Sequence, residues 1–220
     1  MSGNIKDNLL CIKKEIAPYT PNIIAVTKYF GIKEMLEAYD AGLRDFGESR
    51  ANEAIEKIKN LPSEMVKNSK FHFIGHLQTN KADKVVRYFD YIHSVDSLKL
   101  ATIISDESKR VGKKQKVLLQ INNANEEQKF GYSKEDLLKD FSEIIKLDGL
   151  DVVGLMNIAP LTDSESELNR LFSDIFNFKL KLEADFNFPL EELSMGMSND
   201  FKQAAANGST MIRVGRKLFN

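Results

Sequence analysis

The segment from Leu193 to Phe219, LSMGMSNDFKQAAANGSTMIRVGRKLF, contains two short strand-like runs that each end at a glycine. The first run ends at Gly196, and Ser198-Asn199-Asp200 then opens a helical pattern. Because such a turn presents free backbone N–H groups at the start of a helix, it predicts an anion site, with phosphate as the expected anion. The second run ends at Gly215, where a ligand can again approach the main chain. This arrangement is typical of the last two units of a (β/α)8 barrel.

Working outward, apolar runs alternate with longer amphipathic stretches, which is the pattern of repeated βα units. The strand-like runs are Ile23–Thr27, Arg44–Gly47, Phe71–Gly75, Tyr91–Val95, Val117–Asn122, Val152–Asn157, Leu193–Gly196 and Met211–Gly215. Most are apolar on successive residues, as in parallel strands covered on both faces, which favours a closed barrel or a doubly wound sheet.

Helical patterns lie between these runs, at Lys33–Asp40, Arg50–Lys59, Leu98–Val111, Lys134–Lys146 and Glu165–Ala184. Taken with the two glycine turns, the order predicts an α/β protein with a single TIM (β/α)8-type barrel over residues 1–220. The sequence stops soon after the eighth strand-like run, so we expect no full C-terminal helix. A helix from about Ile5 to Ile16 is expected to cover that gap.

Composition excludes several classes of protein. The single cysteine, Cys11, excludes a disulfide framework and a cysteine-based metal cluster and suits a reducing compartment, so a cytoplasmic location is expected. The 31 basic and 32 acidic residues nearly balance, which gives no broad attraction to nucleic acid. No segment is apolar enough to predict a signal peptide or a membrane span.

His72 and His76 are four residues apart, but in a strand and turn they would not share a face, so no metal site is predicted.

Lys28 directly follows the first strand-like run. Alternation places it on the same face as Ile24 and Val26, so an inward-facing strand would put its amine at the barrel mouth. A desolvated lysine can form a Schiff base with an aldehyde, whereas a lysine that snorkels from the strand end is merely solvated. An aldehyde-reactive lysine and a phosphate turn in one barrel mouth together indicate pyridoxal 5′-phosphate (PLP).

Arg213 lies two residues before Gly215 and is expected on the inner face of its strand. A cation there can donate a hydrogen bond to the pyridine nitrogen of PLP, which keeps that nitrogen unprotonated and weakens the ring as an electron sink. The alternative is a surface arginine paired with a carboxylate.

Further residues are candidates to line the pocket. His76 and Asn80 follow the third strand-like run, and Met195 ends the seventh. Polarity of a solvent-facing loop is the alternative explanation for the first two. Lys129 follows the fifth run and could attract a second anion, although an exposed lysine is the default interpretation.

These motifs carry a resemblance. The segments IIAVTK, FGESRANEA, FHFIGHLQTNKA, IHSVDS, NEEQKFG, GLMNIAP, LSMGMSNDF and NGSTMIRVGRKLF resemble the successive signatures of the pyridoxal phosphate homeostasis protein family. The resemblance implies a fold-type III barrel similar to the N-terminal domain of alanine racemase, with PLP bound as a Schiff base on Lys28. It also implies that Arg213 faces the pyridine nitrogen and that phosphate contacts come from Ser198, Asn199, Gly215 and Arg216.

Two positions depart from the family pattern. The usual Gly-Glu-Asn-Arg is here Gly47-Glu48-Ser49-Arg50, so a ring contact made by asparagine is in question at Ser49. Arg216 stands where threonine is common, and its guanidinium could either contact the phosphate or turn to solvent.

Two functions remain open from the sequence. The resemblance implies intracellular PLP homeostasis, in which the protein holds PLP and delivers it, with PLP-dependent apoenzymes as candidate recipients and no established turnover or catalytic residue. The alternative is an amino-acid racemase or related enzyme, which needs a second acid or base such as Tyr29 or Tyr132. A closed barrel has no free sheet edge, so a monomer is expected.

Overall fold

The computed structural model describes residues 4–123 and 130–220, and its centre is a closed barrel of eight parallel strands in the order β1 to β8. The strands are β1 Asn22–Val26, β2 Asp45–Glu48, β3 Lys70–Phe73, β4 Tyr91–Val95, β5 Gln115–Ile121, β6 Leu150–Asn157, β7 Glu192–Ser194 and β8 Met211–Val214. Each overlaps one of the eight predicted runs. Pairing of β8 with β1, from Asn22 opposite Met211 to Ala25 opposite Val214, closes the barrel.

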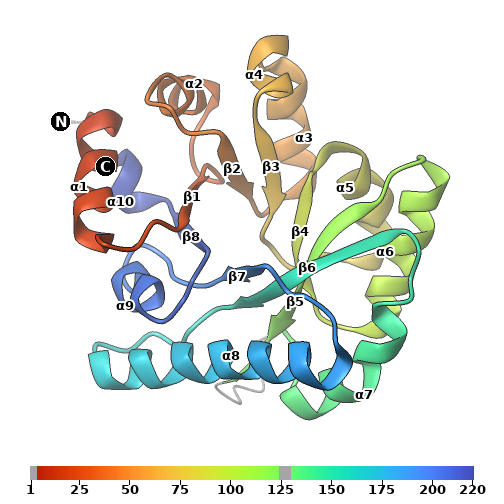
Figure 1. The fold of residues 1–220 in the computed structure, drawn as a ribbon. Coiled ribbons are helices and arrows are strands. Elements are labelled where there is room, and N and C mark those ends of the chain that lie inside the picture. The colour runs from red at the N-terminus through yellow and green to blue at the C-terminus, as the bar shows by residue number, and fades with distance from the viewer. Residues whose placement is uncertain (1–3, 124–129) are drawn as a thin grey trace.

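Helices surround the strands on the outside of the barrel (Figure 1). They are α1 Ile5–Ile16, α2 Ile32–Asp40, α3 Ala51–Asn60, α4 Ser63–Lys67, α5 Ala82–Tyr88, α6 Leu98–Arg110, α7 Lys134–Ile144, α8 Glu165–Phe186, α9 Phe201–Ala206 and α10 Arg216–Phe219, with a short 3-10 helix at Thr79–Lys81. The predicted helices are present to within a few residues. The structure adds α4, α5 and α10, which are short and carry too few turns for a clear apolar period.

Serine side chains define where several helices begin. The hydroxyls of Ser97, Ser133 and Ser164 accept hydrogen bonds from backbone N–H groups in the first turns of α6, α7 and α8. Such caps satisfy N–H groups that have no partner within the helix. The long helix α8 ends at Asn187, whose φ of 47° is left-handed and stops the helix.

The N-terminal helix covers the outside of the barrel beside α9 and α10, where a full last helix is missing, as expected. Helix α1 packs against α9 and against the four-residue helix α10, and Figure 1 shows both termini on this side. Asn8 Nδ2 donates to the Leu218 carbonyl at 3.0 Å, and Glu15 lies 2.7 Å from both Lys202 Nζ and Lys217 Nζ. Residues from the two ends of the sequence therefore close the barrel wall together.

The interior of the barrel differs from the layer outside it. The main hydrophobic core lies between the strands and the helices, whereas a small separate cluster comprises Leu118, Val153 and Met156. Buried polar side chains accompany this small cluster, among them His72, His93 and Ser194. Since a buried polar group is costly without a hydrogen-bond partner, these residues must be paired with one another.

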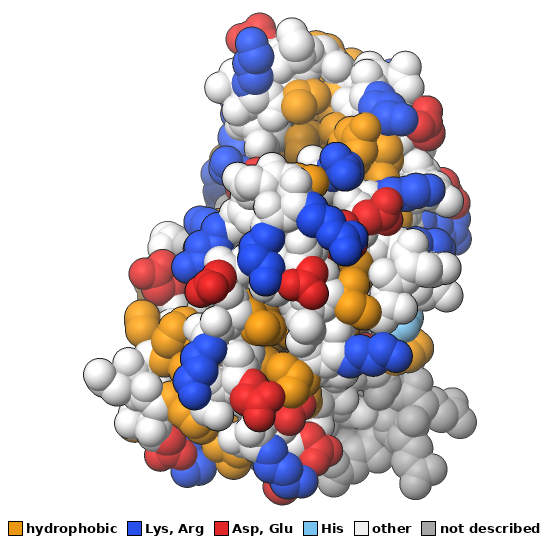
Figure 2. Space-filling view, turned by 90° about the vertical axis from the view of Figure 1, so that its right-hand side faces the viewer, with side chains coloured by type: hydrophobic (Ala, Val, Ile, Leu, Met, Phe, Trp, Pro, Cys, Tyr) orange, Lys and Arg blue, Asp and Glu red, His pale blue; other side chains and the backbone are white. Residues whose placement is uncertain are grey.

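Charges of both signs are mixed on the surface. Lys and Arg side chains are interspersed with Asp and Glu on the face in Figure 2, in keeping with the formal net charge of -1. Among the described residues, no helix is both long and apolar enough to cross a bilayer.

Candidate functional site

A cavity of about 530 Å³ opens at the carboxyl ends of the strands. The residues that line it include Lys28, Ser49, Gly75, His76, Gln120 and Phe130, which follow or end β1, β2, β3 and β5. The carboxyl ends of barrel strands are where enzymes of this architecture place their ligand sites. The predicted Lys28 therefore opens into a cavity of suitable size for a small cofactor.

Lys28 is half-buried at the rim of this cavity. Its Nζ lies 5.2 Å from the centroid of the Tyr29 ring, a cation–π distance, and it makes no hydrogen bond or ion pair with any described residue. Val26 lies two residues before Lys28. The side chains of Val26, Ile24 and Ile74 gather around Gly47, because a Cβ added to Gly47 would meet all three. The strand alternation that predicted an inward Lys28 is consistent with this packing.

A buried ion pair lies next to Lys28. Glu48, at the end of β2, accepts hydrogen bonds from Lys57 Nζ at 2.7 Å and from Thr27 Oγ1 at 2.8 Å. Lys57 also donates to the Thr27 carbonyl at 2.8 Å. Glu48 therefore fixes the side chain of Thr27, and Lys57 fixes its carbonyl. The Glu48–Lys57 ion pair thus positions the backbone that precedes Lys28. The pair was not predicted from the sequence, because Lys57 comes from α3 and looks like an ordinary polar helix residue.

The two glycine turns lie beside the end of β1. The Gly215 N–H donates to Ser198 Oγ at 3.4 Å, which joins the turn after β8 to the turn after β7. A Cβ on Gly215 would lie 3.3 Å from the Val26 carbonyl oxygen, so this turn approaches the β1 backbone closely. Gly196 has a φ of +89°, a conformation that favours glycine. The turns and Lys28 thus share one end of the barrel.

Arg213 is 3% exposed and crosses the inside of the barrel. Its Nη1 donates to the carbonyl and to the hydroxyl of Ser194 at 2.8 and 2.6 Å, and its Nη2 donates to the Asn157 carbonyl at 2.7 Å. Burial lowers the pKa of Arg213 to about 10, and the nearby charge of Asp200 opposes that shift. No described carboxylate is hydrogen-bonded to it, so the surface ion pair considered above is not what this structure contains.

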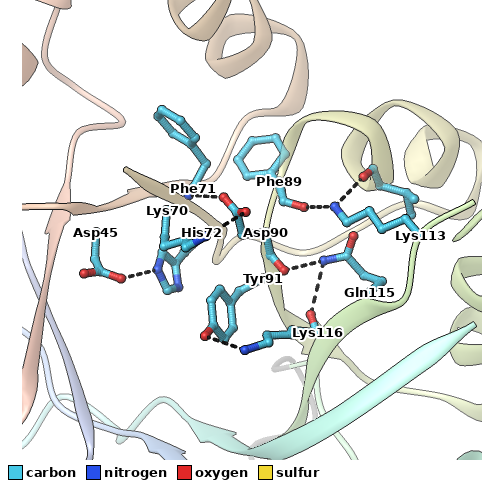
Figure 3. Close-up of polar contacts among 11 residues, drawn as sticks. Asp45, Lys70, Phe71, His72, Phe89, Asp90, Tyr91, Lys113, Gln115 and Lys116 are labelled. Atoms are coloured by element: carbon cyan, nitrogen blue, oxygen red, sulfur yellow. Dashed lines mark hydrogen bonds and ion pairs between the residues drawn. The ribbon is translucent and has the colours of Figure 1, made fainter. Parts of the chain in front are cut away.

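A chain of buried polar groups continues from Ser194. Its Oγ is 3.0 Å from His93 Nδ1, His93 Nε2 is 2.9 Å from His72 Nδ1, and His72 Nε2 is 2.9 Å from Asp45 Oδ1. Figure 3 shows Asp45 directed at the His72 ring, with Tyr91 beside it. The ring centroids of His72 and Tyr91 are 4.5 Å apart and nearly parallel. We call Asp45, His72, His93 and Ser194 the interior relay.

The remaining predicted residues have varied positions. His76 lines the cavity, is 3.3 Å from Asp96 through Nδ1, and stacks on Phe130 with centroids 3.5 Å apart. Asn80 is exposed in the 3-10 helix, and Met195 is buried in the main hydrophobic core.

The residues predicted to contact the phosphate differ in exposure, as do the two positions that depart from the family pattern, Ser49 and Arg216. Asn199 and Arg216 are exposed, and Ser198 and Gly215 are half-buried. Ser49 lines the cavity, and its backbone lies so close to Gly75 that a Cβ there would be 2.4 Å from the Ser49 carbonyl. Lys129 lies outside the described residues.

A second cavity, of about 740 Å³, lies at the opposite end of the barrel. It is lined by the connection from α1 to β1 and by the start of β2, including Pro18, Tyr19, Arg44 and Asp45. None of the predicted site residues lines it. In the described part of the chain, no cluster of three or more His, Cys, Asp or Glu side chains could hold a metal ion.

Comparison with known proteins gives a consistent result. The family pattern described as alanine racemase, N-terminal domain, matches residues 2–220. The pyridoxal phosphate homeostasis protein of Synechocystis is 41% identical over 202 residues, covering 92% of each chain. That of Escherichia coli K12 is 35% identical over 206 residues, covering 92% of this chain and 86% of the relative.

Solved structures agree with these sequence relatives. PipY of Synechococcus elongatus with PLP bound superposes with a TM-score of 0.89 at 37% identity, covering 98% of this chain and all of PipY. Alanine racemase of Clostridium difficile superposes with a TM-score of 0.82 at 17% identity, over 98% of this chain but 56% of the racemase, and thus shows the shared fold alone. Extent, identity and architecture together place the chain in the pyridoxal phosphate homeostasis protein family, built on the alanine racemase N-terminal barrel.

Proposed function

We propose that this protein binds PLP through a Schiff base on Lys28 and acts in PLP homeostasis as a protein that holds and delivers the cofactor, without robust catalysis. The observation that carries the proposal is the meeting of three features at one end of the barrel. They are the amine of Lys28, which has no hydrogen-bond partner in the described chain, the joined turns at Ser198 and Gly215, and the buried guanidinium of Arg213. PLP has one group for each feature: an aldehyde for Lys28, a phosphate for the two turns, and a pyridine nitrogen for Arg213.

The residues present fit that cofactor. A guanidinium has five N–H donors, and three are used by Ser194 and Asn157, which leaves two without a partner among the described residues. A buried donor is costly until it meets an acceptor, and an aromatic nitrogen is one. Lys28 likewise has no anionic partner in the described chain that would have to be displaced.

Each side chain would contribute a distinct part of the binding. The amine of Lys28 would hold the aldehyde carbon as a Schiff base, formed with loss of water. Ser198, Asn199, Gly215 and Arg216 would hold the phosphate, chiefly through the backbone N–H groups of the two turns. Arg213 would donate to the pyridine nitrogen, which keeps that nitrogen unprotonated. His76, which lines the cavity, would contact the ring, whereas Met195 and Asn80 would affect the pocket only indirectly.

The racemase alternative has weaker support. It requires a second acid or base on the other face of a bound amino acid. Tyr132 is buried and its hydroxyl donates to Asp140 at 3.3 Å, and it does not line the cavity. Tyr29 does line the cavity but is 71% exposed, so nothing in the described chain fixes its hydroxyl over a substrate carbon. An arginine donor at the pyridine nitrogen would also keep that nitrogen unprotonated, which weakens the ring as an electron sink for the carbanion that racemisation requires.

The test of binding is chemical trapping. Purified protein incubated with PLP should show the visible absorbance of a Schiff base, and borohydride reduction should fix the cofactor on the peptide that contains Lys28. The variant Lys28→Ala should lose both signals while its circular dichroism is unchanged. Lys33→Ala removes an exposed lysine, 83% accessible in α2, and should behave as the parent. Trapping of PLP on a different lysine in the parent protein would remove Lys28 from this role.

The finer parts of the proposal rest on other features. We propose a cytoplasmic location from the single cysteine and a monomer from the closed barrel, with PLP-dependent apoenzymes as recipients of the cofactor. Deuterium incorporation at the α-carbon of a panel of amino acids separates the two functions. A holding protein should give slow exchange with retained configuration, and rapid scrambling exchange would favour the racemase.

A further inference from the structure

The Arg213 guanidinium is directed neither at solvent nor at a carboxylate, and its Nη1 donates to Ser194. Ser194 Oγ receives a hydrogen bond from Arg213 Nη1, and the interior relay then continues through His93 and His72 to Asp45. His72 and His93 are completely buried, as is Ser194. The relay joins four strands, β2, β3, β4 and β7, that are far apart in the sequence.

The groups at the two ends of the interior relay, Arg213 and Asp45, determine which nitrogen and oxygen atoms carry the protons between them. A guanidinium can only donate, so Ser194 Oγ must accept from Arg213. An ionised carboxylate can only accept, so Asp45 must receive its hydrogen bond from His72 Nε2. A neutral imidazole has one donor and one acceptor nitrogen, and His72 Nδ1 is then the acceptor.

The remaining members follow in sequence. His72 Nδ1 requires a donor, and the partner that the described chain offers is His93 Nε2, at 2.9 Å. With its proton on Nε2, neutral His93 presents Nδ1 as an acceptor to Ser194 Oγ, at 3.0 Å. The serine proton points to His93, which leaves the serine oxygen free to accept from Arg213. Every hydrogen bond of the relay is then satisfied, with the rings neutral and each proton assigned to one atom.

A positive charge on His72 would leave one hydrogen bond of the interior relay without an acceptor. If His72 carried a second proton on Nδ1, His93 would have to accept at Nε2 and donate from Nδ1 to Ser194. The serine oxygen would then receive two donors, and its own proton would need another acceptor. Burial, with the repulsion that a proton on His93 would meet from Arg213, holds the pKa of His93 well below its ordinary value, which agrees with a neutral ring.

We propose that the interior relay is a positioning device for Arg213: neutral His72 and His93, each protonated on Nε2, orient the Ser194 hydroxyl so that it accepts from Nη1 and leaves the two remaining N–H groups of the guanidinium available to the cofactor. The part about the cofactor rests on the proposed function. The proton arrangement does not, and it can be measured on the protein without PLP.

The first measurement is the tautomer of each histidine. Two-bond ¹⁵N–¹H correlation spectra of cofactor-free protein at neutral pH should show His72 and His93 as neutral rings protonated on Nε2, with His76 as a reference ring at the cavity rim. The variant Asp45→Asn retains an oxygen acceptor for His72 and should keep this pattern. Asp45→Ala removes the acceptor and should disturb the His72 signal. An imidazolium, or a proton on Nδ1 of His93, would overturn the proposal.

The second measurement links the relay to PLP. In Ser194→Ala, Arg213 loses one of its acceptors and the relay is interrupted. Loss of a hydrogen bond to a charged group corresponds to roughly tenfold to hundredfold weaker binding, so PLP should be retained about that much less well, and its visible absorbance should titrate at a different pH. Ser94→Ala is the matched control, because its hydroxyl is equally buried and has no hydrogen-bond partner among the described residues.

The outcomes separate the two proposals. If parent protein binds PLP on Lys28, and Ser194→Ala has the same affinity and spectrum as Ser94→Ala, the relay has no positioning role while the proposed function stands. If parent protein fails to bind PLP, the proposed function fails, and the tautomer spectra still decide the proton arrangement. Where Ser194→Ala does not fold, Asp45→Ala provides the same comparison from the partly exposed end of the relay, where the Asp45 side chain is 17% exposed.

Discussion

The ion pair between Glu48 and Lys57 offers the most direct test of how this barrel holds Lys28. The side chain of Glu48 is 2% exposed and that of Lys57 is 17% exposed, so the carboxylate has almost no access to water. In Lys57→Met the apolar stem is kept and the charge is removed. Glu48 then keeps only the hydrogen bond from Thr27 Oγ1, and the Thr27 carbonyl loses Lys57 Nζ as a donor but keeps the Phe30 N–H, at 2.9 Å.

The expected loss can be worked from this geometry. Removing one partner of a buried ion pair costs about 3–5 kcal/mol, because the other charge is left unpaired in the interior. Glu48→Gln should cost less, roughly 1.5–3 kcal/mol, since the amide oxygen can still accept and Lys57 can still reach solvent. The double variant, Glu48→Gln with Lys57→Met, has no buried charge, and the amide that replaces the carboxylate could donate to the Thr27 carbonyl. It should lose at most about 2 kcal/mol and so be more stable than Lys57→Met alone.

Urea unfolding followed by circular dichroism measures these free energies, with cofactor-free protein used throughout so that binding does not contribute. Lys59→Met is the control, since Lys59 lies on the same helix and pairs with Glu56 at the surface. It should show no measurable change. The reasoning would be refuted if Lys57→Met unfolded within about 1 kcal/mol of the parent, or if the double variant were less stable than both single variants. A further consequence is that Lys57→Met should retain PLP less well, because the Thr27 carbonyl beside Lys28 then has one hydrogen-bond donor fewer.

Two other predictions concern the barrel interior. The pKa of His93 is lowered well below 6.5, so the unfolded chain binds a proton that the folded one excludes. Acidification below that pH should therefore reduce the free energy of unfolding by up to about 1.4 kcal/mol per pH unit until the folded pKa is reached. His93→Gln should show a shallower dependence in urea titrations, and equal slopes would count against the assignment. Gly154→Ala would place a Cβ 1.8 Å from the Glu192 carbonyl on β7 and should cost roughly 3 kcal/mol or more, or prevent soluble expression. In Gly31→Ala the new Cβ meets only the flexible end of Glu34, at 3.2 Å, so a comparable loss there would show that the close approach at Gly154 is not the cause.

The architecture was largely predictable because parallel strands buried on both faces give short apolar runs that stand out from the helices between them. Runs such as Ile23–Thr27 and Met211–Gly215 could be recognised without knowledge of their partners. The placement of Lys28 beside the cavity also followed from local alternation. Short helices such as α4 and α5 were not predicted, because one or two turns give no clear period.

The interior relay could not be found in this way, since its members are brought together only when the barrel closes. His72 and Ser194 are more than a hundred positions apart, and no local spacing relates them. A signal was nevertheless present. His72 and His93 each stand in the middle of an apolar run, and a polar residue in a strand covered on both faces must find a partner in the interior. The spacing of His72 and His76 bears only on metal binding, and it does not predict that His72 pairs with His93.

Pairing of β1 with β8 has a consequence for biosynthesis. Lys28 leaves the ribosome long before the turn at Gly215 that lies beside it in the fold. Until β8 has been synthesised, one edge of β1 has no neighbour, and the nascent chain has the Lys28 amine without the Gly215 turn that we propose to hold the phosphate. On that proposal PLP binding requires the eighth strand, so a ribosome-stalled fragment that ends before β8 should leave PLP in solution.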